Sequence, residues 1–480
     1  MPAIEKDRSY IRITLIIAAI VSFVSTFTSN ALNLGISQIS REFMIDQYLL
    51  NWTVTGYILP HAAFLLPFGR LADVIGRKRI YAGGMLFFSV MSLGCGIASS
   101  FPVLLICRIF QGIASAMIFG NSMAVLTSVV PPAERGRAMG LTTAVTYLGL
   151  AVGPVLGGFI CDHLNWRFIF YLISGISAVA FCLAGIKLKD DRRNNKSDRF
   201  DVPGSLLWVP GILLFLFGVS DISEGFIYIL CALFGIIVLA MFFVREKRTP
   251  SPVLPVGAFL GNRVFAFSSL AALISYSATF AVTFLLSLYL QSVRRLGISE
   301  SGLILLAQPV VMAVVSPFAG RLSDRIDSRV PASAGMGITA LGLLFFVFLN
   351  RETSVLPIVL NLAFLGLGFG LFASPNNNAI MGSVDKEFFG LASSTVGTAR
   401  LLGQAFSMTA VALITSLYMK NMTFDSPGYA EGLMKSSRVS FAVFTIFCLT
   451  GVFVSLAGIG LSRRRRRSGG AAPDTGKKRG

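Results

Sequence analysis

The stretch Gly69-Arg-Leu-Ala-Asp73-Val-Ile-Gly76-Arg77 returns 251 positions later as Gly320-Arg-Leu-Ser-Asp324-Arg-Ile-Asp-Ser-Arg329. Each copy follows a long apolar run. Adding the same offset to Ile11, the start of the first apolar run, gives position 262, where a later set of apolar runs begins. The repeat therefore predicts that the chain is built from two related halves.

The composition around this repeat is that of a membrane protein. Of 480 residues, 54% are hydrophobic and 13% charged, with a mean hydropathy of +0.74, whereas about a quarter of the residues in a soluble domain are charged. Nearly the whole chain is used by apolar runs, which leaves no length for a sizeable soluble domain. A soluble enzyme is excluded.

Fourteen apolar runs, from 11–38 to 439–462, are each long enough to cross a bilayer as a helix. They show no alternation with a period of two, which disfavours an outer-membrane barrel. We expect an all-α integral membrane protein with fourteen transmembrane helices, in which two six-helix bundles flank an inserted helix pair. The predicted parts are an N-terminal half 1–188, a central segment 189–262, a C-terminal half 263–462 and a basic tail 463–480.

The net charge of +18 is explained by membrane topology. An even number of spans places both termini on one side. With the termini inside, the inner segments hold about four times as many Lys and Arg residues as the outer loops. We expect a multi-pass protein of the cell membrane with cytoplasmic termini, and a tail able to touch anionic lipid. No basic stretch carries interleaved aromatics, so nucleic-acid binding is not expected.

Two further motifs lie inside spans. Arg108 begins Arg-Ile-Phe-Gln111-Gly in the fourth span, where an unpaired charge must face a cavity or a partner, or reach the outer interface. The fifth span contains Gly149-Leu-Ala-Val-Gly153-Pro154-Val-Leu-Gly157-Gly158. Small residues at this spacing allow two helices to approach closely, and the proline kinks the span.

Together these motifs resemble the major facilitator superfamily, specifically its fourteen-span drug:proton antiporter branch. The resemblance implies that residues 69–79 form an inner loop and that a conformational latch is made by Gly69, Asp73, Gly76, Arg77, Gly320 and Asp324. It implies a role in proton transfer for Arg108. The family carries an arginine similar to Arg400, which is therefore a further candidate for proton coupling. The resemblance also marks Gly149, Gly153, Pro154, Gly157 and Gly158 as the signature typical of antiporters.

One departure from that branch concerns the first span. Drug-exporting members carry an embedded aspartate there, whereas Thr28 occupies the aligned position. Every acidic residue lies outside the predicted spans, so His61 is the titratable candidate for proton coupling. His61 could equally be a neutral hydrogen-bonding partner between helices. We expect a neutral to positive cavity that prefers neutral or anionic amphipathic compounds over lipophilic cations.

Polar residues inside spans are the candidates for lining a substrate cavity. For Asn376 and its two neighbouring asparagines, hydrogen bonding to another helix and lining the cavity are both open. The full set of candidates is Thr28, Asn30, Asn33, Tyr57, Gln111, Gln308, Asn376, Asn377 and Gln404.

The leading functional hypothesis is a secondary active exporter of a small amphipathic compound, of the multidrug-efflux type, working by alternating access with proton antiport. Alternatives are a proton-independent facilitator or lipid or metabolite carrier, and a non-transporting sensor of the same fold. No GxxxxGK[ST] motif is present, which excludes an ATP-driven pump. No enzyme activity, metal or cofactor is expected; the expected partners are a small-molecule substrate, protons and the lipid bilayer, with the monomer as functional unit.

Overall fold

The computed structural model describes residues 2–45, 47–188, 200–220, 225–249, 252–254, 261–419 and 428–457. Within these ranges the regular structure is helical and includes no strand. The predicted tail 463–480 and much of the two linkers around the inserted pair lie outside the described residues.

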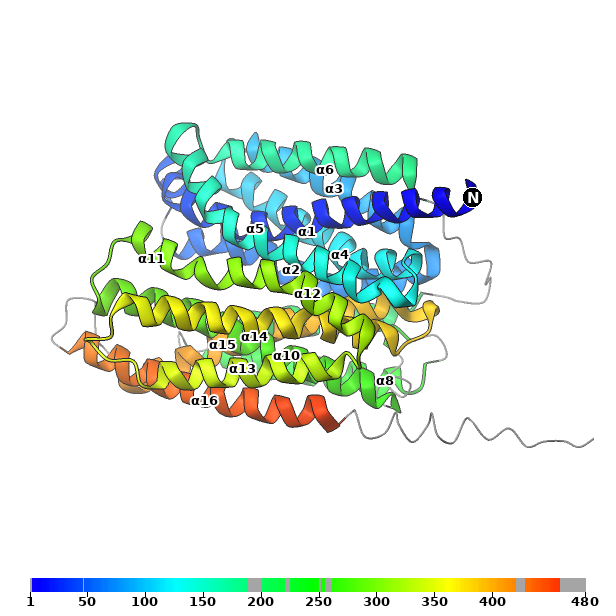
Figure 1. The fold of residues 1–480 in the computed structure, drawn as a ribbon. Helices are drawn as coiled ribbons and strands as arrows, with labels where there is room; N and C mark the ends of the chain where they lie inside the picture. Colours follow the sequence, from blue (N-terminus) through cyan, green and yellow to red (C-terminus); the bar gives the residue numbers. More distant parts are fainter. Residues whose placement is uncertain are drawn as a thin grey trace, which may run out of the picture.

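The helices run nearly parallel to one axis of the molecule (Figure 1). The N-terminal half consists of α1 (Pro2–Phe43), α2 (Gln47–Ile75), α3 (Arg77–Gly96), α4 (Phe101–Val129), α5 (Arg135–His163) and α6 (Arg167–Lys187). Where the inserted pair is predicted, the chain forms α7 (Val202–Ser220) and α8 (Phe226–Glu246). The C-terminal half consists of α10 (Arg263–Leu288, extended by a π-helical turn Tyr289–Val293), α11 (Ile298–Leu305), α12 (Ala307–Arg325), α13 (Arg329–Val347), α14 (Val355–Gly382), α15 (Phe389–Tyr418) and α16 (Tyr429–Ala457).

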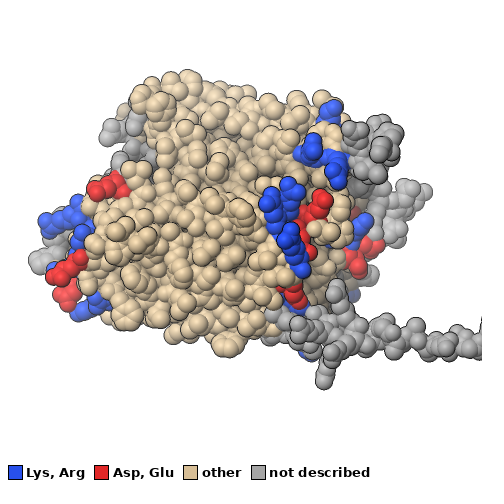
Figure 2. Space-filling view, in the orientation of Figure 1, with Lys and Arg blue, Asp and Glu red and all other residues tan. Residues whose placement is uncertain are grey.

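Thirteen helical segments of the described chain are long and apolar enough to cross a membrane, with α11 and α12 counted together. The helix α3, which begins with three basic residues, is not among them. Figure 2 shows a broad band without charged side chains between two charged ends. The protein is therefore a multi-pass membrane protein.

The repeated motif is helical, which corrects the expectation of a loop from residue 69 to 79. The helix α2 continues to Ile75, α3 begins at Arg77, and Gly76 alone separates them. The turn is made possible by Gly76, whose φ of 117° is favourable only for glycine. We call the end of the bundle that carries this turn the terminal end, because α1 begins and α16 finishes there (Figure 1).

The two halves meet through two equivalent helix pairs. The helix α2 packs on α15, and α12, its counterpart under the 251-residue offset, packs on α5. Glycines allow both crossings: a side chain on Gly69 would collide with the carbonyl oxygen of Gly390, and one on Gly136 would collide with that of Gly320. The repeat in the sequence is thus a two-fold pseudo-symmetry in the contacts between the halves.

The helices α7 and α8 pack mainly on each other, and α7 also packs on α2 and α15. Trp208 Nε1 donates to the carbonyl oxygen of Ala63 in α2 at 3.1 Å, and Thr409 Oγ1 in α15 donates to that of Val219 at 3.0 Å. Helix α7 therefore contacts both halves where they cross.

A partly buried ion pair connects the start of α7 to the last turn of α8. Asp201 accepts two hydrogen bonds from Arg245, at 2.5 and 2.9 Å, and one from the backbone N–H of Gly204. Burial opposes ionisation of Asp201, but these hydrogen bonds outweigh it and hold the pKa of the carboxyl below its ordinary value.

At the opposite end of the bundle, hydrogen bonds connect the end of α1 to the start of α6. Glu42 accepts hydrogen bonds from Arg167 at 2.6 Å and from Trp166 Nε1 at 2.8 Å. The Arg167 hydrogen bond lowers the pKa of Glu42.

Candidate functional site

A central cavity lies between the two halves. It is lined by side chains of α1, α4 and α5 from one half and α10, α14 and α15 from the other. Its lining residues are Ser22, Phe119, Ser122, Met123, Leu126, Thr142, Thr143, Thr146, Tyr147, Tyr276, Asn377, Ser393 and Arg400. The cavity lies where duplicated membrane halves usually place a ligand site, at their shared interface.

Arg400 is the one charged residue of this lining. Its guanidinium lies 5.1 Å from the ring centroid of Phe119 and 6.0 Å from that of Tyr276. Within the described chain it has no hydrogen-bond or salt-bridge partner. The arginine is thus held in the cavity by two aromatic faces, with its N–H donors unused.

His61 lies behind the same aromatic ring. It is 8% exposed, its ring meets Phe119 edge-on at 5.7 Å and Tyr57 at 5.8 Å, and its Nε2 has no partner in the described residues. Phe119 therefore stands between His61 and Arg400. The coupling role of His61 stays a prediction.

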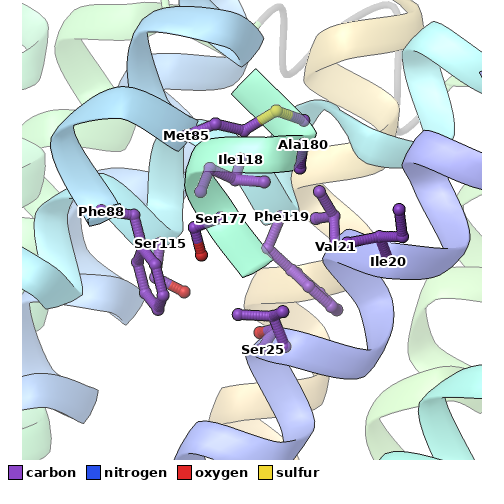
Figure 3. A pocket seen from close by; sticks show the side chains of 11 residues that line it. Ile20, Val21, Ser25, Met85, Phe88, Ser115, Ile118, Phe119, Ser177 and Ala180 are labelled. Carbon is purple, nitrogen blue, oxygen red and sulfur yellow. The ribbon is translucent and has the colours of Figure 1, made fainter. Parts of the chain in front are cut away.

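A second cavity lies inside the N-terminal half, among α1, α3, α4 and α6 (Figure 3). Apolar side chains such as Ile20, Val21, Met85 and Phe88 form most of its wall. Phe119 lines both cavities. An apolar compartment thus adjoins the polar one across a single side chain.

Arg108 lies in a polar network within the N-terminal half. It is 1% exposed, donates to the carbonyl oxygen of Thr53 at 2.9 Å and to Gln111 Oε1 at 2.6 Å, and stacks 4.5 Å from the ring centroid of Tyr57. Gln111 donates in turn to Ser92 Oγ at 2.7 Å. Arg108 is buried and donates to neutral acceptors. Its side chain therefore has partners within the N-terminal half and does not extend away from them toward the outer interface.

The two aspartates of the repeat, Asp73 and Asp324, cap helices of the opposite half. Asp73 accepts hydrogen bonds from the backbone N–H groups of Gly390 and Leu391, both at 3.0 Å, in the first turn of α15. Arg77 holds the same carboxylate at 2.9 Å and also donates to the carbonyl oxygen of Lys386.

Asp324 repeats this arrangement on the other side of the pseudo-symmetry axis. It accepts from the backbone N–H groups of Gly136 at 2.6 Å and Arg137 at 2.8 Å, in the first turn of α5. Each carboxylate thus satisfies N–H groups that have no partner within their own helix and meets the positive end of a helix dipole. The terminal end is closed by two equivalent caps.

The glycine motif of α5 forms the contact with α1. A side chain on Gly149 would collide with Thr26, and a Cβ on Gly157 would lie 2.5 Å from the carbonyl oxygen of Ala31. Pro154 lies inside α5. These observations agree with close helix packing; the link to transport direction stays a prediction.

The candidate cavity residues are distributed over several environments. Of these, Asn377 lines the central cavity, whereas Asn376 donates to the carbonyl oxygen of Ser268 in α10. Tyr57 bonds Ser115 Oγ at 2.8 Å, Thr28 donates within α1, and Gln308 is buried with Nε2 unpartnered in the described chain. Gln404 lies half-buried in α15, and the side chains of Asn30 and Asn33 lie outside the described residues.

Sequence reasoning did not select most of the actual lining. The run Thr142-Thr143-Ala-Val-Thr146-Tyr147 places four polar groups on neighbouring turns of one span, on the face that meets the cavity. The spacing of these four residues in the sequence could therefore have indicated a polar helix face that lines a cavity. Helices that extend beyond the predicted spans also include acidic residues. Asp73, Asp324 and Glu246 lie within the last turns of α2, α12 and α8. No carboxylate is among the residues that line the central cavity.

Comparison with known proteins identifies the class. The family model of the Major Facilitator Superfamily matches residues 18–408, and the chain belongs to this family of membrane transporters. It is a transporter of small molecules and not an enzyme.

The curated relatives span most of the chain. The riboflavin transporter RibZ of Clostridioides difficile is 28% identical over 92% of this chain and 96% of its own length. The multidrug resistance protein Stp of Mycobacterium tuberculosis is 29% identical over 85% and 76%, and the cephamycin export protein CmcT of Amycolatopsis lactamdurans is 30% identical over 92% of both chains.

Among solved structures, the human organic anion transporter MFSD10 superposes with a TM-score of 0.64 at 13% identity, over 93% of this chain and 99% of that one. At this identity the match shows the fold alone.

Proposed function

We propose that this chain is a fourteen-span exporter of a small amphipathic compound that works by alternating access. The observation that carries the proposal is the pair of equivalent caps. Asp73 joins α2 to α15 and Asp324 joins α12 to α5, each by two hydrogen bonds from a helix N-terminus. Such contacts close one end of the cavity and can be broken without disturbing either bundle. Under the positive-inside rule this end is cytoplasmic.

The fourteenth span is α3. It packs along α4 and α6 and connects the terminal end of α2, through Gly76, to the start of α4 at the opposite end. A helix in that position has to traverse the same distance as its neighbours. Together with the thirteen segments named above, which include the inserted pair α7 and α8, the helix α3 gives fourteen spans.

The proposal also includes the direction of transport, which is export, and its driving force, which is proton antiport. Support for export comes from the complete glycine motif of α5 and from relatives described as a multidrug resistance protein and an export protein. His61, Arg108 and Arg400 are the residues through which a proton gradient would act. The monomer as functional unit is also part of the proposal, and a cavity lined by residues of one chain supports it.

A second candidate mechanism is favoured by one observation. The residues lining the central cavity include no carboxylate that could exchange a proton for the substrate, so a carrier that does not use protons has support from the same structure.

Purified protein in lipid vesicles tests both. We expect counterflow of a fluorescent amphipathic compound, and uphill transport when a pH gradient is imposed. Nigericin, which collapses the pH gradient, should stop the uphill component. Counterflow without any response to nigericin selects the proton-independent carrier, and absence of counterflow refutes transport.

A further inference from the structure

The central cavity collects polar side chains that have no protein partner. Arg400 makes no hydrogen bond or salt bridge within the described chain, and the same holds for the side chains of Thr143, Tyr147, Tyr276 and Asn377. Ser393 Oγ, which is buried, has no partner either. Buried polar groups in a membrane protein are normally satisfied by neighbouring helices. Six unpartnered polar groups around one space, three of them buried, therefore indicate a surface built for a polar ligand.

These groups are mainly hydrogen-bond donors. Arg400 carries five N–H donors and no acceptor, and the two phenols and the hydroxyls can each donate. No carboxylate lines the cavity to use them. A planar guanidinium binds carboxylate or phosphate oxygens through paired hydrogen bonds, which are stronger than neutral ones. The lining thus matches the oxygens of an acid group.

The walls next to Arg400 are apolar. Phe119 lies directly under the guanidinium, and Met123 and Leu126 continue the same side of the cavity along α4. Beyond Phe119 lies the apolar cavity of the N-terminal half (Figure 3).

We propose that the substrate is an amphipathic organic anion. Its acid group binds Arg400 together with the phenols of Tyr147 and Tyr276, and its ring system lies against Phe119. The proposal rests on the transport function above and adds the charge of the substrate. A lipophilic cation finds the opposite environment, because its charge would lie beside an unpaired guanidinium in a medium of low polarity.

Two dyes of nearly the same shape test this charge preference. Fluorescein and rhodamine 123 share the xanthene and phenyl rings, and at pH 7.5 fluorescein is an anion and rhodamine 123 a cation. Binding is measured by fluorescence anisotropy with the full chain in a neutral detergent. We expect wild type to bind fluorescein at least about tenfold more tightly than rhodamine 123, the factor expected for one charged hydrogen-bonded contact.

Variants then locate the contact. Arg400→Gln should weaken fluorescein binding by about tenfold or more and remove the preference between the dyes, and Arg400→Lys should keep part of it. Tyr276→Phe, which keeps the ring, should weaken fluorescein binding less. Arg351→Gln is the matched control, since Arg351 is exposed and lies outside the cavity. Melting temperatures of all variants show that the fold is kept.

Two results would overturn the proposal: wild type that binds rhodamine 123 as tightly as fluorescein or tighter, including failure to bind fluorescein, and Arg400→Gln that keeps fluorescein affinity within about twofold. The transport function fails separately. Tight, Arg400-dependent fluorescein binding without counterflow in vesicles would refute transport and leave the anion site standing. Counterflow of rhodamine 123 but not of fluorescein would support transport and refute the anion site.

Discussion

The two caps at the terminal end predict that Asp73→Asn opens that end of the cavity. Asp73 makes two charged hydrogen bonds to the first turn of α15, and asparagine can replace only one of them, without the charge. A lost hydrogen bond of this kind, together with the helix dipole, is worth about 2 kcal/mol. The closed form should therefore lose about 30-fold in population relative to the open one.

Hydrogen–deuterium exchange of the purified protein measures this shift. If opening is concerted, the mutation at Asp73 should speed exchange at the first turn of α15, around Gly390, and also at the first turn of α5, around Gly136. The second site contacts Asp324 and not Asp73, so its exchange reports opening of the whole end. Substrate affinity should change little, because neither cap residue lines the cavity.

Matched variants complete the design. Asp324→Asn should give the same pattern with the two sites exchanged. Glu352→Gln, which alters an exposed acid outside both caps, should leave exchange unchanged. Faster exchange confined to α15 in Asp73→Asn would mean that the cap is only local and would refute the concerted gate, as would lost substrate affinity with unchanged exchange.

Three further predictions concern coupling, packing and pH. His61→Gln should abolish the response of vesicle transport to an imposed pH gradient while exchange at equal pH persists; transport that is still driven by the gradient would rule out a coupling role for this residue. Gly157→Val should lower the melting temperature and destabilise the fold by about 2 kcal/mol, because a side chain there meets the backbone of Ala31; an unchanged melting temperature would show that α1 can move aside. Asp201→Asn should lower the melting temperature at pH 7.5 but much less at pH 3: the lowered pKa of Asp201 means that its ion pair with Arg245 contributes stability above the ordinary aspartate pKa and loses it as pH falls through the folded value. An equal loss at both pH values would contradict that account.

The architecture could be predicted because its signals are local and repeated. Apolar runs of sufficient length mark the spans, and one motif repeated at a fixed offset marks the halves. Helix ends were less predictable. Polar residues extend α2 to Ile75 and start α16 at Tyr429, since helices continue beyond the apolar band when their polar side chains find partners or water. The latch motif is consequently part of a helix rather than a loop.

The lining of the cavity was harder to predict, because it depends on how helices face one another. Asn377 was predicted as a cavity residue and Arg400 as a coupling residue, and both line the cavity. Tyr57 and Gln111 were also predicted as cavity residues but lie in the network around Arg108. Residue type shows that a polar group inside a span needs a partner, and only the packing of several helices shows whether that partner is protein or ligand.

The charge of the substrate bears directly on how transport is driven. An anion leaving a cell whose interior is negative gains about 2.3 kcal/mol per charge for each 100 mV of membrane potential. If the acid group of the substrate remains ionised beside Arg400, export needs no proton and no embedded aspartate, and Thr28 in the first span ceases to be an anomaly. His61 would then serve packing against Phe119. In the same vesicles, transport driven by the potential alone stops with valinomycin and potassium, which collapse the potential, and persists with nigericin, which collapses the pH gradient. Proton antiport, in contrast, is slowed by nigericin.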